Sequence, residues 1–360
     1  MSGLGLHERL APSMKLGRRA ALKAGLGAVA AVGAPVVVQA QAGLKLPLAT
    51  IWPDGNFHTI NARHFAEEVR KATSGAVEID VKSGGELSFT GPEQLRAVRD
   101  GLVPMADILD TQQIGDHPIM GVGAIPFLCA SAAELKVLHK YLRPEFEKVA
   151  LKNNQTILYM VPWPAQYLHL RIKAESVDGL KAVKIRVPDK GTHDMCSAIG
   201  MAPALMPWGE TIAALSSGAV SGVSTSAVSG VDGKFWEVLK FFHATSHTWS
   251  SQIVTINNDT WKKISPANQR AIFELAAKLE PAFWERSLQA DRDSARKLSD
   301  GGMQRVTVPE PMMAELRKRT APMVVDFYER VPPAGEADQG LPRRDEARVS
   351  AQITSSVGLY

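Results

Sequence analysis

The sequence predicts an α/β protein with about two domains, from its length, its composition and the order of its periodic segments. At ~150 residues per domain, 360 residues correspond to about two domains. Hydrophobic residues make up 45% and charged residues 22%, ordinary values for a globular chain. Strand-like and helix-like segments alternate along most of the chain, the pattern of an α/β fold. These observations exclude wholesale disorder and a multi-span membrane protein.

The net charge of +4 arises from the first 42 residues. They carry five basic residues and one acidic residue, which leaves 36 of each kind in 43–360. The high isoelectric point is therefore a property of the N-terminal segment and does not favour nucleic-acid binding, which needs a basic face on the folded domain. The chain has two cysteines and neither a CxxC nor an HExxH motif, so it is not a disulfide scaffold and carries no metal-binding signature.

Residues 1–42 have the features of an export signal. The basic stretch Lys15–Lys23 precedes an uncharged Ala/Gly/Val run, and cleavage is expected after Ala40 or Ala42. The Arg18-Arg19 pair resembles a twin-arginine signal, although the general secretion route fits equally well. The run is shorter than the ~20 residues that span a bilayer, and an uncleaved anchor is the alternative. Either export route predicts a periplasmic protein.

The two cysteines, Cys129 and Cys196, would then be located in an oxidising compartment. The sequence leaves open whether they form a disulfide with each other.

The first half of the mature chain alternates strands with helices. Strands are expected at 46–50, 77–81, 105–109 and 155–160. Thr59 is expected to cap a helix that runs to 73, and a second helix is expected over 90–101. A helical stretch over 131–150 is expected to be interrupted at Pro144, because proline removes an intrahelical hydrogen bond.

The second half repeats the alternation. Strands are expected at 168–172, 183–187 and 252–256, and helices at 190–199, 209–217, 266–298 and 311–330. The helix over 266–298 is expected to bend at Pro281. After Arg330 the polar segment 333–360 has few large apolar residues, and we expect it to be disordered or loosely attached.

Enzyme motifs are weak in this sequence. Gly222–Ser226 begins like the nucleophile elbow of hydrolases but has Ser226 where the second glycine belongs. His58 and His64 are six residues apart, so they do not share a helix face as metal ligands would. No convincing acid–base pair and no phosphate-binding glycine loop is found. An extracytoplasmic hydrolase or isomerase therefore remains only an alternative.

A binding site is indicated by a basic strand and two tryptophans. Strand alternation places Lys184 and Arg186 on one face, where Arg186 can hold a carboxylate with two parallel hydrogen bonds. The alternative is a solvated basic face. Trp163 and Trp208 lie in proline-flanked loops after expected strands, where open α/β folds bind ligands. Each could instead fill a core.

Several motifs, taken in order, resemble the solute-binding subunits of tripartite ATP-independent periplasmic (TRAP) transporters, the DctP-type family, over about 45–330. They include Ile125-Pro126-Phe127-Leu128, Lys184-Ile185-Arg186-Val187-Pro188 and Trp208-Gly209-Glu210. The resemblance implies two α/β lobes of the type II-like periplasmic binding fold, with a long helix crossing both. Lobe I would comprise 43–166 and about 253–285, and lobe II 167–252 and about 286–332.

The resemblance also implies ligand-binding residues. The strand arginine that anchors a carboxylate corresponds to Arg186, the following aromatic to Trp208, and a polar position to Thr225. The remaining candidate ligand-binding residues are Trp163, Gln166, His247, Gln252, Phe57, Gln112 and Ser224. Pro164-Ala165-Gln166 stands where some acidic-sugar binders carry a second arginine. One firm arginine with two tryptophans suits a monocarboxylate with an apolar body, such as an aromatic 2-oxo acid.

The expected function is therefore that of a non-enzymatic periplasmic receptor for a small organic acid. The resemblance implies delivery of the ligand to a small and a large membrane permease subunit. We expect a monomer with no cofactor, no metal and no nucleic-acid partner. A receptor that serves a sensor kinase is the second alternative, because its lobes would look alike.

Overall fold

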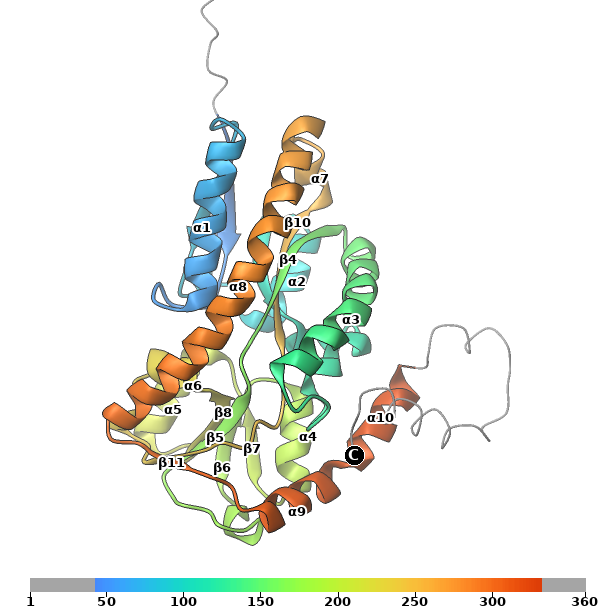
Figure 1. Cartoon of the computed structure of the whole chain (residues 1–360). Helices are drawn as coiled ribbons and strands as arrows, with labels where there is room; N and C mark the ends of the chain where they lie inside the picture. The colour runs from blue at the N-terminus through green and yellow to red at the C-terminus, as the bar shows by residue number, and fades with distance from the viewer. Residues whose placement is uncertain (1–42, 332–360) are drawn as a thin grey trace, which may run out of the picture. The chain divides into compact units, whose positions relative to one another are not determined.

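The computed structural model describes residues 43–331 (Figure 1). The predicted signal peptide and the predicted disordered tail lie outside the described residues. Within them the strands form two separate mixed sheets, one of five strands and one of six. We call the part built on the first sheet lobe I and the part built on the second sheet lobe II.

The sheet of lobe I has the strand order β2-β1-β3-β10-β4. Its strands are β1 (Leu44–Ala49), β2 (Val77–Lys82), β3 (Met105–Leu109), β4 (Gln155–Pro162) and β10 (Ser251–Asn257). β1 is parallel to β2 and β3, whereas β10 is antiparallel to β3 and β4. The helices of lobe I are α1 (Phe57–Ala72), α2 (Gln94–Arg99), α3 (Ala132–Lys152) and the short α7 (Asn258–Trp261).

The start of α1 differs from the prediction. Its N-cap is Asn56, whose side-chain oxygen accepts the backbone N–H of His58 at 2.9 Å. Thr59, the expected cap, lies inside the first turn, and its hydroxyl donates to the Trp52 carbonyl at 3.2 Å. Asparagine caps a helix as well as threonine does, so the helix begins three residues earlier than the sequence pattern suggested.

The predicted interruption of α3 is wrong, because the helix continues through Pro144. Proline removes one intrahelical donor and leaves the carbonyl of Lys140 without it. Both Pro144 and Lys140 are exposed, so water can bond that carbonyl. Leu142 and Phe146 bury the opposite face of the same turns in the core of lobe I, which keeps the helix in one piece.

The sheet of lobe II has the strand order β11-β9-β5-β8-β6-β7. Its strands are β5 (Gln166–Leu170), β6 (Lys184–Val187), β7 (Ala202–Leu205), β8 (Gly222–Ser226), β9 (Phe241–His243) and β11 (Gln304–Val306). Its helices include α4 (Lys190–Ala198), α5 (Trp208–Ser217) and α6 (Ala227–Asp232). The segment that begins like a nucleophile elbow is the buried strand β8.

One long helix belongs to both lobes. α8 (Pro266–Asp300) packs against α1 and β4 of lobe I and against α6 and β11 of lobe II (Figure 1, orange). It remains a single helix across Pro281. Next to this proline, Glu280 pairs with Arg143 of α3 at 2.6 Å and accepts the backbone N–H of Met160 in β4 at 3.1 Å. The expectation of a long helix crossing both lobes is confirmed.

The C-terminal helix predicted over 311–330 is two helices, α9 (Glu310–Thr320) and α10 (Pro322–Arg330). Pro322 lacks the N–H that would continue the hydrogen-bond ladder, so the helix ends before it. Leu316 of α9 packs in the core of lobe II, whereas Phe327 of α10 packs in the core of lobe I. The predicted assignment of about 286–332 to lobe II therefore does not describe α10.

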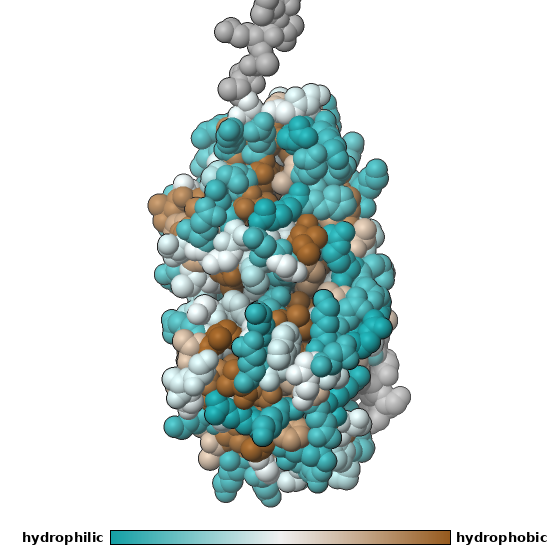
Figure 2. Space-filling model, turned by 90° about the vertical axis from the view of Figure 1, so that its left-hand side faces the viewer, coloured by the Kyte–Doolittle hydropathy of each residue, from teal (hydrophilic) through white to brown (hydrophobic). Residues whose placement is uncertain are grey.

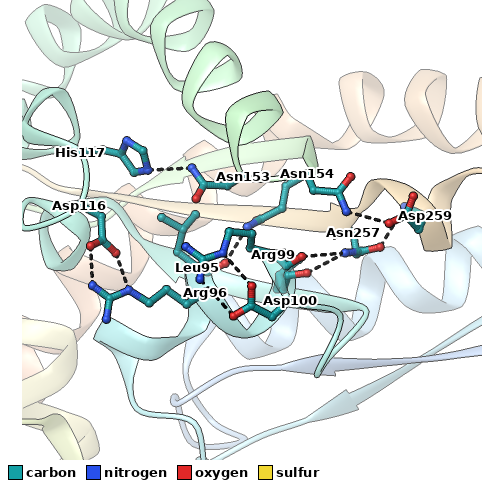
Figure 3. A network of polar contacts seen from close by, with 12 residues as sticks. Leu95, Arg96, Arg99, Asp100, Asp116, His117, Asn153, Asn154, Asn257 and Asp259 are labelled. Atoms are coloured by element: carbon teal, nitrogen blue, oxygen red, sulfur yellow. Dashed lines mark hydrogen bonds and ion pairs between the residues drawn. The ribbon is translucent and has the colours of Figure 1, made fainter.

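A polar network holds α2 and α7 on the sheet of lobe I (Figure 3). Asn257, at the end of β10, donates to the carbonyl of Val98 in α2 at 2.8 Å. Asn154 and Asp259 join the start of β4 to α7 at 2.9 Å. These bonds hold α2 and α7 on the sheet and leave the opposite strand ends to form the site described below.

The surface view in Figure 2 shows one face of the molecule, mostly hydrophilic or neutral, with hydrophobic residues in separate patches. Within residues 43–331, no helix is both long and apolar enough to cross a bilayer. Cys129 and Cys196 are free, buried thiols in different cores, one in each lobe. Burial raises the pKa of the Cys129 thiol to about 12.

Candidate functional site

A cavity lies between the two lobes, with an empty volume of about 480 Å³ that includes space open to solvent. Lobe I contributes residues that follow the ends of its strands: Trp52 after β1, Thr111 and Gln112 after β3, and Trp163 after β4. Lobe II contributes Arg186 from β6, Trp208 from the start of α5 and Thr225 from β8. Strand ends of both sheets therefore converge on one small space.

Arg186 is a buried cation in the wall of this cavity, with 2% of its surface exposed. Its Nε donates to the Met206 carbonyl at 3.0 Å, and no carboxylate of the described residues lies within 4.0 Å of its nitrogens. Burial lowers the pKa of Arg186 to about 10, and the charge of Asp189 opposes this shift. The guanidinium therefore stays protonated at neutral pH without an ion-pair partner. Lys184, on the same strand, is exposed.

Aromatic rings surround the guanidinium. The Arg186 side chain lies over the Trp208 ring, with 5.7 Å from Cζ to the ring centroid. Trp52 of lobe I faces Trp208 of lobe II at 6.1 Å between centroids and meets Trp163 edge-on at 4.6 Å. The cavity thus combines a desolvated positive charge with an apolar aromatic wall, an arrangement that fits a small anion with an apolar body.

Trp163 is held in place by groups behind it. Its Nε1 donates to the side-chain oxygen of Gln252 at 2.9 Å, and the Gln252 amide donates to the Asp107 carbonyl at 2.6 Å. Burial raises the pKa of the Asp107 carboxyl to about 7, while hydrogen bonds from Thr50 and Gln252 act in the opposite direction. Phe57 packs edge-on against the same indole at 5.4 Å. Gln252 and Phe57 therefore support the wall from behind and do not line the cavity.

Six of the ten predicted ligand-binding residues line the cavity, namely Arg186, Trp208, Thr225, Trp163, Gln166 and Gln112. The Gln112 amide donates to the Pro188 carbonyl of lobe II at 3.2 Å, which makes it a contact between the lobes. The Gln166 amide donates to the Pro164 carbonyl at 2.7 Å. The other four, Gln252, Phe57, His247 and Ser224, do not line it.

Ser224 and His247 bond each other inside lobe II. The Ser224 hydroxyl and His247 Nε2 are 2.9 Å apart, and His247 Nδ1 is 2.7 Å from the Thr245 hydroxyl. All three are buried, and burial lowers the pKa of His247 to about 3. Along β8 the side chains alternate between the two faces of the sheet, so Thr225 faces the cavity while its neighbour Ser224 does not. These three side chains therefore hydrogen-bond through His247 and not toward the cavity.

Two of the cavity residues that were not predicted, Trp52 and Asp189, matter for the chemistry of the site. Trp52 stands in Ile51-Trp52-Pro53 after β1, the same tryptophan–proline pattern after a strand that singled out Trp163. That signal was therefore present in the sequence. Asp189 follows Val187-Pro188 at the end of β6, and only the placement of lobe I opposite this strand end makes it a cavity residue.

Two α/β lobes that enclose an unneutralised arginine and aromatic walls define a two-lobe solute-binding protein. The described residues hold no cluster of three or more side chains suited to a metal ion. The model of bacterial extracellular solute-binding protein family 7, DctP, matches residues 48–331, and the chain belongs to this family. Its members are periplasmic solute receptors that work with TRAP transporters.

Solved structures support the same assignment. The Bordetella pertussis receptor DctP7, described as binding pyroglutamic acid, superposes with a TM-score of 0.78 at 27% identity, over 80% of this chain and 95% of that chain. A marine metagenome TRAP protein described as specific for pyroglutamate gives a TM-score of 0.78 at 25% identity, over 82% and 97% of the two chains.

An uncharacterized protein of Sinorhizobium fredii is 27% identical over 309 residues, 82% of this chain and 55% of the relative. The chain thus spans about half the length of this relative.

Proposed function

We propose that this chain is an exported, non-enzymatic receptor that binds a small monocarboxylate between its lobes for uptake by a TRAP transporter. The observation that carries the proposal is the buried Arg186 guanidinium, which lines the cavity without a carboxylate partner. Removing a charge from water is costly unless a counter-charge replaces the lost hydration. A ligand carboxylate supplies that counter-charge and can bond the guanidinium through two parallel hydrogen bonds.

The apolar part of the ligand would lie against Trp208, Trp163 and Trp52. These rings come from both lobes, so a ligand between them contributes contacts only when the lobes are closed. Such differential contact is what allows a ligand to shift a hinge equilibrium. Thr225 and Gln166 would bond further oxygen atoms of the ligand.

The residues of the cavity wall and the similarity of the chain to solved receptors narrow the class of ligand. A second arginine is absent from the described cavity wall, which favours one carboxylate over two. Pyroglutamate, named for two similar structures, and aromatic 2-oxo acids, suggested by the tryptophans, are the two ligand classes to compare. Export with cleavage after Ala40 or Ala42, delivery to a small and a large permease subunit, and a monomeric state belong to the same proposal.

The decisive experiment is thermal unfolding of the exported protein against pyroglutamate, aromatic and aliphatic 2-oxo acids, 2-hydroxy acids, dicarboxylates and sugar acids. A ligand at 100 times its Kd stabilises the protein by about 2.7 kcal/mol. For a chain of this size that is a rise in Tm of about 5 °C. We expect a rise with one class of monocarboxylate and recovery of that acid chemically unchanged.

The matched variants are Arg186→Ala and Lys184→Ala. Lys184 lies on the same strand but is exposed, so its removal should leave the shift intact, whereas Arg186→Ala should abolish it. An unchanged shift in a folded Arg186→Ala protein, or conversion of the acid to a product, would contradict the proposed function. Sequencing the N-terminus of the periplasmic protein tests the cleavage site.

A further inference from the structure

Asp189 is the single acidic residue among the described residues that line the cavity, and 5% of its surface is exposed. It comes three residues after Arg186, at the end of β6, so one strand end brings a cation and an anion to the same space. No ion pair within 4.0 Å joins the two side chains. Asp189 therefore forms no direct ion pair with Arg186, although the charge of each acts on the pKa of the other.

One oxygen of Asp189 has a structural role. Oδ1 accepts the backbone N–H of Thr192 at 2.8 Å and caps helix α4. The other oxygen has no backbone donor in the described part of the chain. The hydroxyls of Thr111 and Thr192 are the side-chain donors beside this carboxylate. Burial raises the pKa of Asp189, while the Thr192 N–H, the two nearby threonine hydroxyls and the charge of Arg186 act in the opposite direction.

The rest of the wall offers several hydrogen-bond donors and one neutral acceptor without a partner, Gln112 Oε1. Arg186 presents N–H groups, and Trp52 Nε1 is buried without a partner. Thr225 adds a hydroxyl. A ligand oxygen that accepts hydrogen bonds therefore has several partners, whereas a ligand N–H or O–H has one strong charged acceptor, Asp189.

We propose that Asp189 determines specificity by accepting a hydrogen bond from an N–H or O–H group of the ligand close to its carboxylate. Lactam acids and 2-hydroxy acids carry such a donor. A 2-oxo acid has at this position an oxygen that can only accept hydrogen bonds. This oxygen and the Asp189 carboxylate would be two acceptors facing each other, so the acid would be rejected. This inference rests on the proposed function, because it requires a carboxylate held by Arg186, and it chooses between the two ligand classes left open there.

Another buried carboxyl provides a matched control. Asp110 does not line the cavity, and its Oδ1 accepts the backbone N–H groups of Thr111 at 2.7 Å and Ser251 at 3.0 Å. Asp110 and Asp189 influence each other electrostatically. An Asp110→Asn change replaces this neighbouring carboxyl group but keeps an oxygen for both N–H groups, and it leaves the cavity acceptor in place.

The test is calorimetric titration, at neutral pH, of the protein expressed from its full-length sequence with matched pairs of acids. One pair is pyroglutamate and its lactone analogue, in which a ring oxygen replaces the N–H. The other pair is phenyllactate and phenylpyruvate. We expect the donor-bearing member of the bound pair to bind about tenfold or more tightly, because an unpaired buried acceptor is costly.

In Asp189→Asn the preference should fall to about threefold or less or reverse, because the amide can still cap α4 but presents a donor to the cavity. Asp189→Ser, which also caps a helix, is the second variant should the amide destabilise the fold. Asp110→Asn should retain the preference. Equal binding of both members by the unmodified protein, or an undiminished preference in Asp189→Asn, would overturn the inference and leave the receptor function standing. Failure of every acid to bind would overturn both.

Discussion

Asn56 and Asp232 join the two lobes by a hydrogen bond outside the ligand cavity. The amide nitrogen of Asn56, the N-cap of α1 in lobe I, donates to the Asp232 carboxylate at the end of α6 in lobe II at 2.6 Å. Neither residue lines the cavity. Burial raises the pKa of Asp232 to about 6. The bond favours the arrangement of the lobes seen here without contacting the ligand.

Asp232→Ala is expected to weaken ligand binding, because the closed form loses a bond that the open form lacks. Hydrogen bonds to charged groups contribute about 1.5–3 kcal/mol, so the Kd should rise about tenfold or more. Asp232→Asn keeps an acceptor for Asn56 and should stay within about threefold of the unmodified protein. Titration with the acid that gives the largest thermal shift measures both. Equal losses in the two variants would show that the bond does not favour closure.

Gly191→Ala is expected to hinder closure by a steric contact. A Cβ atom at Gly191 in α4 would lie 2.5 Å from the Cβ of Ala124, across the gap between the lobes. Overpacking of this kind costs about 1–3 kcal/mol, and the affinity for the ligand should fall about tenfold. The Tm of the ligand-free protein should change little, because the lobes can separate.

Gly209→Ala is the matched control for that change. A Cβ atom at Gly209 in α5 meets no atom within 4 Å, so ligand affinity should be retained. A comparable loss in both variants would point to a general effect of the added methyl group rather than to the contact with Ala124.

Gln252→Leu is expected to lower both stability and affinity. The substitution leaves the Trp163 N–H without its partner in a buried site, which costs about 1–3 kcal/mol. The free energy of unfolding from denaturant titration and the Kd should both report the loss. Adding Trp163→Phe removes the unpaired N–H, so the double variant should be more stable than the sum of the single changes predicts. Strict additivity would show that the two residues do not act together.

Asp107→Asn is expected to remove a pH dependence of stability. Burial raises the pKa of Asp107 to about 7, above its unfolded value of 3.8. As the pH rises, Asp107 therefore loses its proton at a lower pH in the unfolded chain than in the folded protein. The stability that protonated Asp107 contributes is complete below about pH 4 and is lost as the pH rises to 7. The loss amounts to at most about 4 kcal/mol.

Unfolding of the unmodified protein and the Asp107→Asn variant from pH 4 to 8 measures this difference. The variant should gain stability relative to the unmodified protein as the pH rises. Asp300→Asn, at an exposed position, should leave the slope unchanged. Parallel curves for the unmodified and Asp107→Asn proteins would contradict the prediction.

Elements with strong periodicity were predictable from sequence, and the polar or short ones were not. Val77–Lys82 alternates between apolar and charged residues, and Met105–Leu109 is a short, largely apolar run, so both strands were predicted. Ala202–Leu205 is a short strand that contains Pro203, and Gly222–Ser226 consists largely of small polar residues. Their strand conformation depends on pairing with β6, which no local pattern records.

The site was predictable where local sequence decides which way a side chain points. Strand alternation put Arg186 on the face opposite Ile185 and Val187, and the structure places Arg186 in the cavity wall. The roles of Gln252 behind Trp163, and of Asp189 opposite lobe I, depend on contacts between segments far apart in the chain. The same is true of α10, whose Phe327 packs into the apolar core of lobe I, far from it in the sequence.

The path of the chain between the sheets has a consequence for how the molecule folds. The chain passes from one lobe to the other after β4, after β9, along α8 and again after α9. Neither lobe is one continuous stretch of sequence, so no truncation yields an intact half. Calorimetric unfolding should accordingly show one cooperative transition, and a protease cut in any single connection should leave the fragments associated.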